Sequence, residues 1–208
     1  MNRDMLFPAC HLQMFMQEKP VTLLREDESV KHGDYLFLVN SLSVELMREY
    51  RISSAQNGWF LLKTGEALPM HSYMFSDNDL FYFEGFSGFE DTFRWSTDGE
   101  STIYMHLEEG NYVFEVNHIG IPRDILDIRE LNYRFFINDN LLAEFDGEHI
   151  GSNLTLEIEV PAQYVFDGLN SFTIRYDTWS PTEYGSPDGR LLGIAINGIE
   201  VVEVEPYA

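Results

Sequence analysis

The stretch LNYRFFINDNLLAEFD, residues 131 to 146, decides the fold class, because two runs of alternating residues flank a short turn sequence. NDN at 138–140 suits a tight hairpin, since Asn and Asp tolerate a positive φ. Side chains alternate along a strand, so one face of the first run should carry Leu131, Tyr133, Phe135 and Ile137. The other face should carry Arg134, Phe136 and Asn138. The stretch therefore predicts an antiparallel pair of strands.

The same period of two continues on both sides of this stretch. Strands are predicted for DLFYFEG (79–85), STIYMHL (101–107), NYVFEVN (111–117), NLTLEIEV (153–160), NSFTIRY (170–176), RLLGIAI (190–196) and IEVVEV (199–204). EEGN at 108–111, DGLN at 167–170 and NG at 197–198 separate them as turns. Only PRDILDIRE, 122–130, has possible helical spacing, and a loop would serve as well. Eight or nine short antiparallel strands predict a mainly β protein, a jelly-roll-like β-sandwich.

One strand gives a testable register. Within NLTLEIEV the core face should carry Leu154, Leu156, Ile158 and Val160, whereas Thr155, Glu157 and Glu159 should face water.

The first third of the chain has a mixed pattern. PVTLL (20–24), DYLFLVN (34–40) and NGWFLLKT (57–64) favour strands, and SLSVELMREY (41–50) favours an amphipathic helix with Ser41 or Ser43 as its N-cap. This order predicts a small βαβ-like unit with a right-handed crossover. The polar stretch 64–79 contains a proline and marks the boundary. Residues 1–66 are thus predicted to form a small α/β segment and residues 67–208 the β-sandwich.

Composition narrows the possible partners. The 35 acidic and 13 basic residues give a net charge of −22, which disfavours nucleic acid and anionic lipid surfaces. Cys10 is the single cysteine and the six histidines lack metal-site spacing, so neither a disulfide nor a zinc site is predicted. No run approaches the roughly 20 apolar residues of a membrane span. We expect either a cytoplasmic protein or a piece of a longer, exported or membrane-anchored one.

Two turn-rich loops precede strands and hold the candidate ligand-binding residues. The first loop lies in GFSGFEDTFRWSTDGESTIYMHL (85–107) and contains Glu90, Arg94 and Trp95. The second runs from Asp177 through WSPTEYGSPDGRLLGIAING (179–198) and contains Asp177, Trp179, Glu183, Tyr184 and Arg190. An arginine beside a carboxylate can lock such a loop, so the sequence predicts a clasp in which Arg190 pairs with Asp188 or Glu183. Alternatively, the loop residues line a groove beside Glu90 and Trp95. Trp95 and Trp179 are either flat platforms for a sugar ring or core aromatics.

The motifs GFSGFEDTFRWS (85–96), FFINDNLLAEF (135–145) and SPTEYGSPDGRLLGIAI (180–196) resemble the β-sandwich domains attached to membrane-embedded glycosyltransferases and related cell-surface polysaccharide proteins. The resemblance covers roughly residues 80–204. WFLLKT (59–64) ends a segment similar to the small α/β stretch that follows the last membrane span of such proteins. The family implies an extracytoplasmic, glycan-associated setting.

Three functions remain open. The first is a non-catalytic module that contacts a glycan or a membrane-protein partner. The second is a polysaccharide hydrolase or lyase, which needs two carboxylates about 5–9.5 Å apart. The third is a purely structural interaction domain. No catalytic residue and no cofactor are predicted; a structural calcium is the one metal to consider, although the acidic loops lack the spacing of a dedicated calcium loop.

Overall fold

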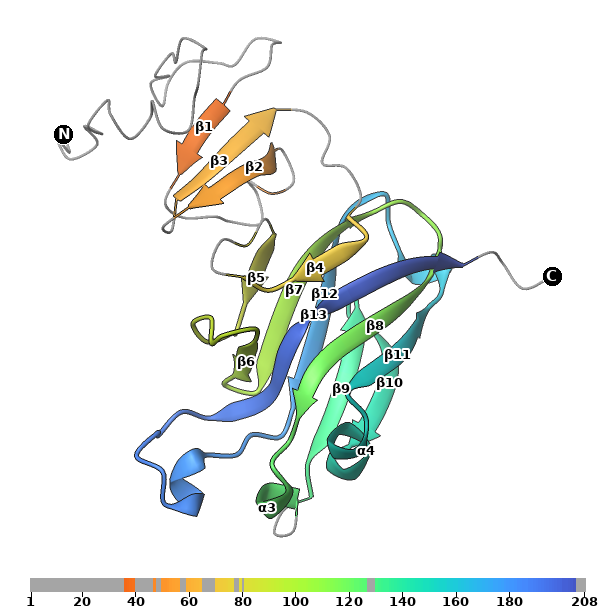
Figure 1. The fold of residues 1–208 in the computed structure, drawn as a ribbon. Helices are drawn as coiled ribbons and strands as arrows, with labels where there is room; N and C mark the ends of the chain where they lie inside the picture. Colours follow the sequence, from red (N-terminus) through yellow and green to blue (C-terminus); the bar gives the residue numbers. More distant parts are fainter. Residues whose placement is uncertain are drawn as a thin grey trace, which may run out of the picture.

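The computed structural model describes residues 36–39, 47, 50–56, 59–64, 70–76, 79, 81–126 and 130–204. The first part forms a three-stranded sheet of β1 (Leu36–Val39), β2 (Tyr50–Gln56) and β3 (Trp59–Thr64), in the order β1-β3-β2 (Figure 1). The strands expected within 34–40 and 57–64 are confirmed, whereas PVTLL lies outside the described residues.

The predicted βαβ unit is wrong. β3 pairs antiparallel with both β1 and β2, so the first and last strands are not joined as a parallel crossover. The sequence YRISSAQ, which carried no strand prediction, forms β2. Of the expected helix only Met47 and Tyr50 are described, and Met47 alone is helical. Met47 is buried, and His106 Nε2 lies 3.0 Å from its carbonyl oxygen, so this part of the chain contacts the sandwich.

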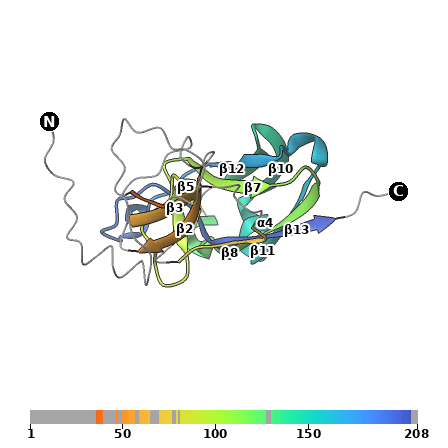
Figure 2. The same ribbon diagram turned by 90° about the horizontal axis from the view of Figure 1, so that it is seen from above.

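The second part is a β-sandwich, which confirms the predicted fold class. One sheet has the order β10-β9-β12-β7-β5, and the other has the order β11-β8-β13-β4 with β6 also paired to β13. Figure 2 shows the two layers facing each other. The strands are β4 (Ser72–Met74), β5 (Tyr82–Glu84), β6 (Arg94–Thr97), β7 (Glu100–Leu107), β8 (Asn111–Gly120), β9 (Asn132–Ile137), β10 (Asn140–Asp146), β11 (Thr155–Val160), β12 (Gly168–Tyr176) and β13 (Leu192–Val204).

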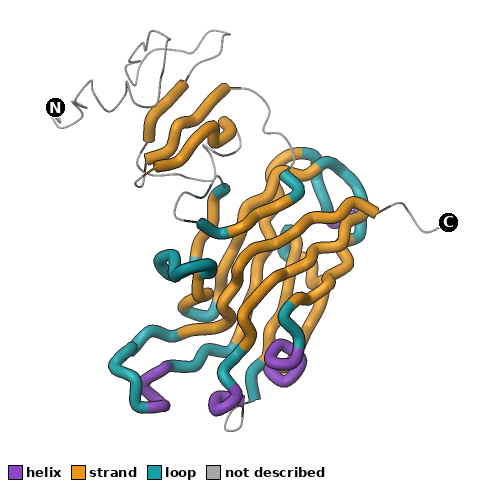
Figure 3. The backbone as a smooth tube through the Cα atoms, viewed as in Figure 1, coloured by secondary structure: helices purple, strands orange, loops and turns teal. Residues whose placement is uncertain are grey.

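Short helical segments lie at the ends of strands (Figure 3): α3 (Arg123–Leu126), α4 (Gly147–Ser152), η1 (Ala162–Tyr164) and η2 (Pro181–Tyr184). α3 shows that PRDILDIRE forms a single helical turn in its described part. β4 lies inside the stretch 64–79, which was expected to be a boundary, and it pairs with β13 of the sandwich. The sandwich therefore includes residues 72–74.

The turns at 138–140 and 197–198 have different outcomes. Asn138 and Asp139 have φ of 47° and 62° and join β9 to β10, as predicted. The predicted turn at NG is wrong, because β13 runs through it with shifts in register. A Cβ on Gly198 would lie 2.7 Å from the Tyr73 carbonyl oxygen on β4. This glycine is explained by the close approach of a neighbouring strand rather than by a reversal of the chain.

The core lies between the two sheets. The predicted inner face of β9 is confirmed, since all four of its residues are buried. Phe136 is buried as well, because the Arg175 guanidinium covers its ring at 4.6 Å. On β11 the predicted alternation holds from residue 155 to 160. Leu154 was predicted inside and is 66% exposed, because it precedes the strand and follows α4.

Candidate functional site

The two turn-rich loops meet through Arg190. Its Nη1 donates to Glu90 Oε1 at 2.7 Å, while Nε and Nη2 donate to Asp188 Oδ2 at 2.9 and 2.7 Å. The predicted pairing with Asp188 is confirmed, and Glu90 is an additional partner from the other loop. These hydrogen bonds, that of Asp188 first, raise the pKa of Arg190 above its usual range, and Arg190 in turn lowers the pKa of Asp188. Arg190 is therefore a clasp between the loops.

Glu183 has a local role instead of pairing with Arg190. It belongs to a capping box at η2, in which its Oε1 accepts from the Ser180 backbone N–H at 3.2 Å. The turn then ends at Gly185, whose φ of 80° suits glycine. Tyr184 is 36% exposed on the surface of the same turn. The prolines and glycines thus fix one loop conformation, to which Glu183 contributes.

Trp179 is a core residue. It is 4% exposed, and its Nε1 donates to the Gly193 carbonyl oxygen at 2.9 Å. Its ring packs edge to face against Trp95, with 5.5 Å between centroids, and half-buried Trp95 makes a similar contact with Phe93. A ring enclosed in this way cannot stack on a sugar, so the platform interpretation of Trp179 is wrong.

Arg94 is also occupied inside the molecule. Its side chain is 11% exposed and its Nη2 lies 2.8 Å from Asp79 Oδ2. Its guanidinium lies over the Phe83 ring at 4.9 Å and donates to the Ser87 carbonyl oxygen. Burial raises the pKa of Asp79 in spite of the hydrogen bonds from Ser76 and Arg94. The structure does not support Arg94 as a ligand-binding residue, because its donors face the protein.

Asp177 belongs to a different surface, a hollow of about 360 Å³ that we call the Asp177 hollow. Asp177 Oδ2 accepts from the backbone N–H and the side-chain amide of Asn132, at 3.0 and 2.9 Å. The lining comes from the start of β9, the end of β10 and the residue after β12: Asn132, Arg134, Glu144, Phe145, Asp146 and Asp177.

The other lining residues follow from the β9–β10 hairpin. Arg134 and Glu144 lie opposite each other in its register. Phe145 stacks on His149 with 4.6 Å between centroids, and Asp146 Oδ1 accepts the His149 backbone N–H as the N-cap of α4. Of the predicted ligand residues only Asp177 lines this hollow. The outward positions of the hairpin, once its register is set, were the sequence signal that could have found Asn132, Arg134, Glu144 and Asp146, whereas Phe145 lies opposite Tyr133 on the core side.

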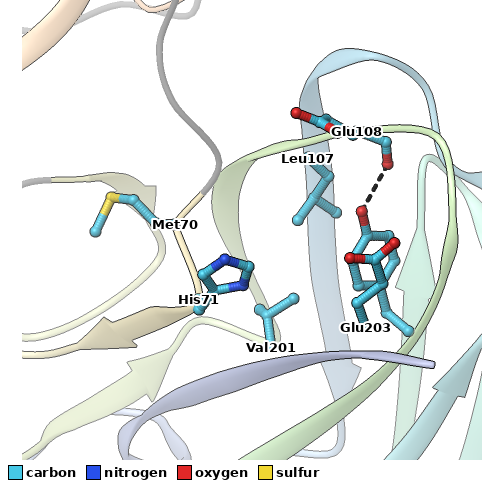
Figure 4. Close-up of a pocket in the computed structure, with 7 residues that line it drawn as sticks. Met70, His71, Leu107, Glu108, Val201 and Glu203 are labelled. Atoms are coloured by element: carbon cyan, nitrogen blue, oxygen red, sulfur yellow. Dashed lines mark hydrogen bonds between the residues drawn. The ribbon is translucent and has the colours of Figure 1, made fainter.

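A second hollow of about 310 Å³, the Glu203 hollow, lies where β7 ends and β8 begins (Figure 4). Its lining consists of Met70, His71, Leu107, Glu108, Tyr112, Val201 and Glu203. The Tyr112 hydroxyl donates to the Glu108 carbonyl oxygen at 2.8 Å.

The described part of the chain has neither a metal-binding cluster nor a membrane-spanning helix. There, no group of three or more His, Cys, Asp or Glu side chains could hold a metal ion, and no helix combines the length and apolar character of a membrane span. Cys10 lies outside the described residues.

The described part of this chain from residue 70 onward is therefore a β-sandwich whose surface includes the Asp177 hollow and the Glu203 hollow. No protein-family model matches it, and neither does any curated protein sequence. Among solved structures, it is similar to a family 35 carbohydrate-binding module from an environmental isolate, with a TM-score of 0.41, 14% identity, and 67% of this chain and 98% of that chain covered. The module of the same family from Clostridium thermocellum gives a TM-score of 0.37 and 11% identity, over 66% of this chain and 100% of that one.

A third structure is an exo-β-1,3-galactanase from Phanerochaete chrysosporium with β-1,3-galactotriose. Its TM-score is 0.30 at 16% identity, over 67% of this chain and 30% of that chain. Similarity this distant assigns no ligand, so function has to be inferred from the residues of this chain.

Proposed function

We propose that this chain is a non-catalytic, extracytoplasmic β-sandwich module of a cell-envelope polysaccharide system and that it binds glycan at the Asp177 hollow. The observation that carries the proposal is the mixed lining of that hollow. Sugar hydroxyls both donate and accept, and the hollow offers acceptors in Glu144, Asp146 and Asp177 beside the donors of Arg134. The part of Phe145 that stays exposed, beside its ring contacts with Phe135 and His149, adds a small apolar contact to the lining.

The state of these groups in the protein supports binding. Arg134 and Glu144 are exposed, and neither side chain forms a hydrogen bond or ion pair with another described residue. Asp177 is held in place by Asn132, yet it has further lone pairs for a ligand. A sugar would therefore meet one positioned carboxylate and two unoccupied charged side chains without first breaking a network.

The cell-envelope setting and a membrane-protein partner come from the resemblance of the loop motifs. The burial of Trp179 and Arg94 favours the rival, a purely structural domain, since both residues serve the core. The two functions differ in whether any glycan binds.

The test is a glycan array of envelope polysaccharides, followed by calorimetry on the hits with the full chain. Arg134→Gln and Glu144→Gln should each weaken binding about tenfold, which corresponds to about 1.4 kcal/mol. Glu159→Gln is the matched control, because it removes one exposed carboxylate from the other sheet. A reducing-end assay on the same polysaccharides should show no product. Absence of any bound glycan would overturn the proposal, and release of reducing ends would replace it with a hydrolase.

A further inference from the structure

The acidic charge of this protein is concentrated in the sandwich. Residues 67–208 contain 26 acidic and 6 basic residues, a net charge of −20 out of −22 for the whole chain. The three lysines of the sequence are at positions 19, 31 and 63, so this region contains none. A surface of this kind attracts cations and disfavours anionic ligands over its whole extent.

The Glu203 hollow combines this charge with an apolar surface. Figure 4 shows Leu107 and Val201 lying between His71 and Glu203, with the carboxylate of Glu108 above Leu107. No Lys or Arg contributes to the lining. Within the described residues, neither carboxylate accepts a hydrogen bond or forms an ion pair. Both are therefore available to a ligand.

Hydrogen bonds hold two walls of the Glu203 hollow in place. The Val201 backbone N–H donates to the His71 carbonyl oxygen at 2.8 Å, which fixes the strand edge on one side. Tyr112 is 5% exposed, and its bond to the Glu108 backbone fixes the turn on the other side. Burial raises the pKa of Tyr112, and Glu203 and Glu108 raise it further, which reflects the negative potential of the hollow.

We infer that the Glu203 hollow binds the side chain of a lysine from a partner polypeptide. The ammonium group would lie between the carboxylates of Glu108 and Glu203, and its aliphatic stem would pack on Leu107 and Val201. A lysine matches both halves of this surface, since its four-carbon stem is apolar and its head is a compact cation.

Other ligands match less well. An arginine gains most from bidentate pairing and from stacking on an aromatic face, and Tyr112 is too buried to offer its face. An amino sugar would place ring hydroxyls against Leu107, Val201 and Met70, which cannot hydrogen-bond them. The lining of the Glu203 hollow has neither a side-chain amide nor a guanidinium, whereas that of the Asp177 hollow has both, so a sugar matches the Asp177 hollow better.

The experiment is an amide NMR titration of the full chain with Nα-acetyl-lysine methylamide at low salt. The uncharged Nα-acetyl-norleucine methylamide is the ligand control, because it has the same stem without the ammonium group. We expect saturable shifts at residues 107–112 and 201–203 in the millimolar range with the lysine derivative, and at least tenfold weaker binding of the norleucine derivative.

Two variants separate the hollow from the general charge of the surface. Glu203→Gln should weaken binding at least fivefold, whereas Glu157→Gln, which removes one carboxylate from the outer face of β11, should change it less than twofold. Both variants should retain the dispersed spectrum of the folded protein, and Glu108→Gln replaces Glu203→Gln if the latter does not. Equal loss in the two variants, no shift at all, or equally tight binding of glucosamine to these residues would each overturn the inference.

Discussion

Replacing Trp179 should destabilise the protein strongly, because its indole is part of the core that joins the two turn-rich loops. Trp179→Ala removes a side chain that is 4% exposed and packs against Trp95. Large-to-small changes of this type cost about 3–5 kcal/mol, and the cost here includes the loss of the hydrogen bond to the Gly193 carbonyl oxygen. Trp179→Phe keeps most of the apolar volume but loses that bond, so about 1–3 kcal/mol is expected.

Urea denaturation of the full chain, followed by far-UV circular dichroism, measures the free energy of unfolding. For a chain of this size, 3–5 kcal/mol corresponds to a lower Tm by roughly 6–20 °C. Phe166→Ala is the control, since it truncates an aromatic residue that is 59% exposed and should cost less than about 1 kcal/mol. If Trp179→Ala unfolds within about 1 kcal/mol of the unmodified protein, the indole is not a core residue and the ligand-platform interpretation returns.

Three further predictions concern charged groups. Arg190→Met should speed amide hydrogen exchange across residues 179–191, because the clasp between the loops is lost. It should lower the free energy of unfolding by less than about 1 kcal/mol, because the ion pairs of Arg190 are partly exposed. Unchanged hydrogen exchange would contradict the clasp. Burial lowers the pKa of His118 from 6.5 to about 4, so the folded state binds this proton less readily than the unfolded chain. The stability due to neutral His118 should be complete above pH 6.5 and fall by about 3 kcal/mol as the pH drops towards 4, and His118→Asn should remove this part of the pH profile in urea titrations. Glu115 lies opposite Glu157 on β11 and Glu200 on β13. Glu115→Lys should therefore raise the free energy of unfolding by about 0.5–1 kcal/mol at low salt. This gain should shrink at 1 M salt if it is electrostatic.

Local patterns predicted the sandwich well, because strands such as β7, β8 and β11 alternate between buried and more exposed residues. The hairpin at 138–140 needed only two residues with positive φ, a property visible in the sequence. The same local reasoning failed at Gly198, where the reason for glycine is the backbone of β4, more than 120 residues earlier. It also failed for the β1–β3 unit, because the choice between a parallel and an antiparallel pair is made by contacts that no single segment contains.

The candidate site was harder to predict for the same reason. Arg190 and Asp188 are two residues apart, so their pairing could be predicted, whereas Glu90 is brought to Arg190 only by the fold. Arg94 and Trp179 had the chemistry of a sugar site but lie in the core. Nothing in the local sequence separates an aromatic or an arginine of the core from one that faces solvent.

Two charged residues of the turn-rich loops, Glu183 and Arg190, are poor candidates for ligand contact, because they already form hydrogen bonds within the protein. A ligand that recruited Arg190 or Glu183 would first have to break the clasp or the helix cap, which would offset much of the gained binding energy. Glu203 and Arg134 differ, since within the described residues no hydrogen bond or ion pair occupies their charged groups, and each borders an open hollow. Variants of these two residues should therefore change binding while leaving the free energy of unfolding almost unchanged, whereas Trp179→Ala should do the reverse.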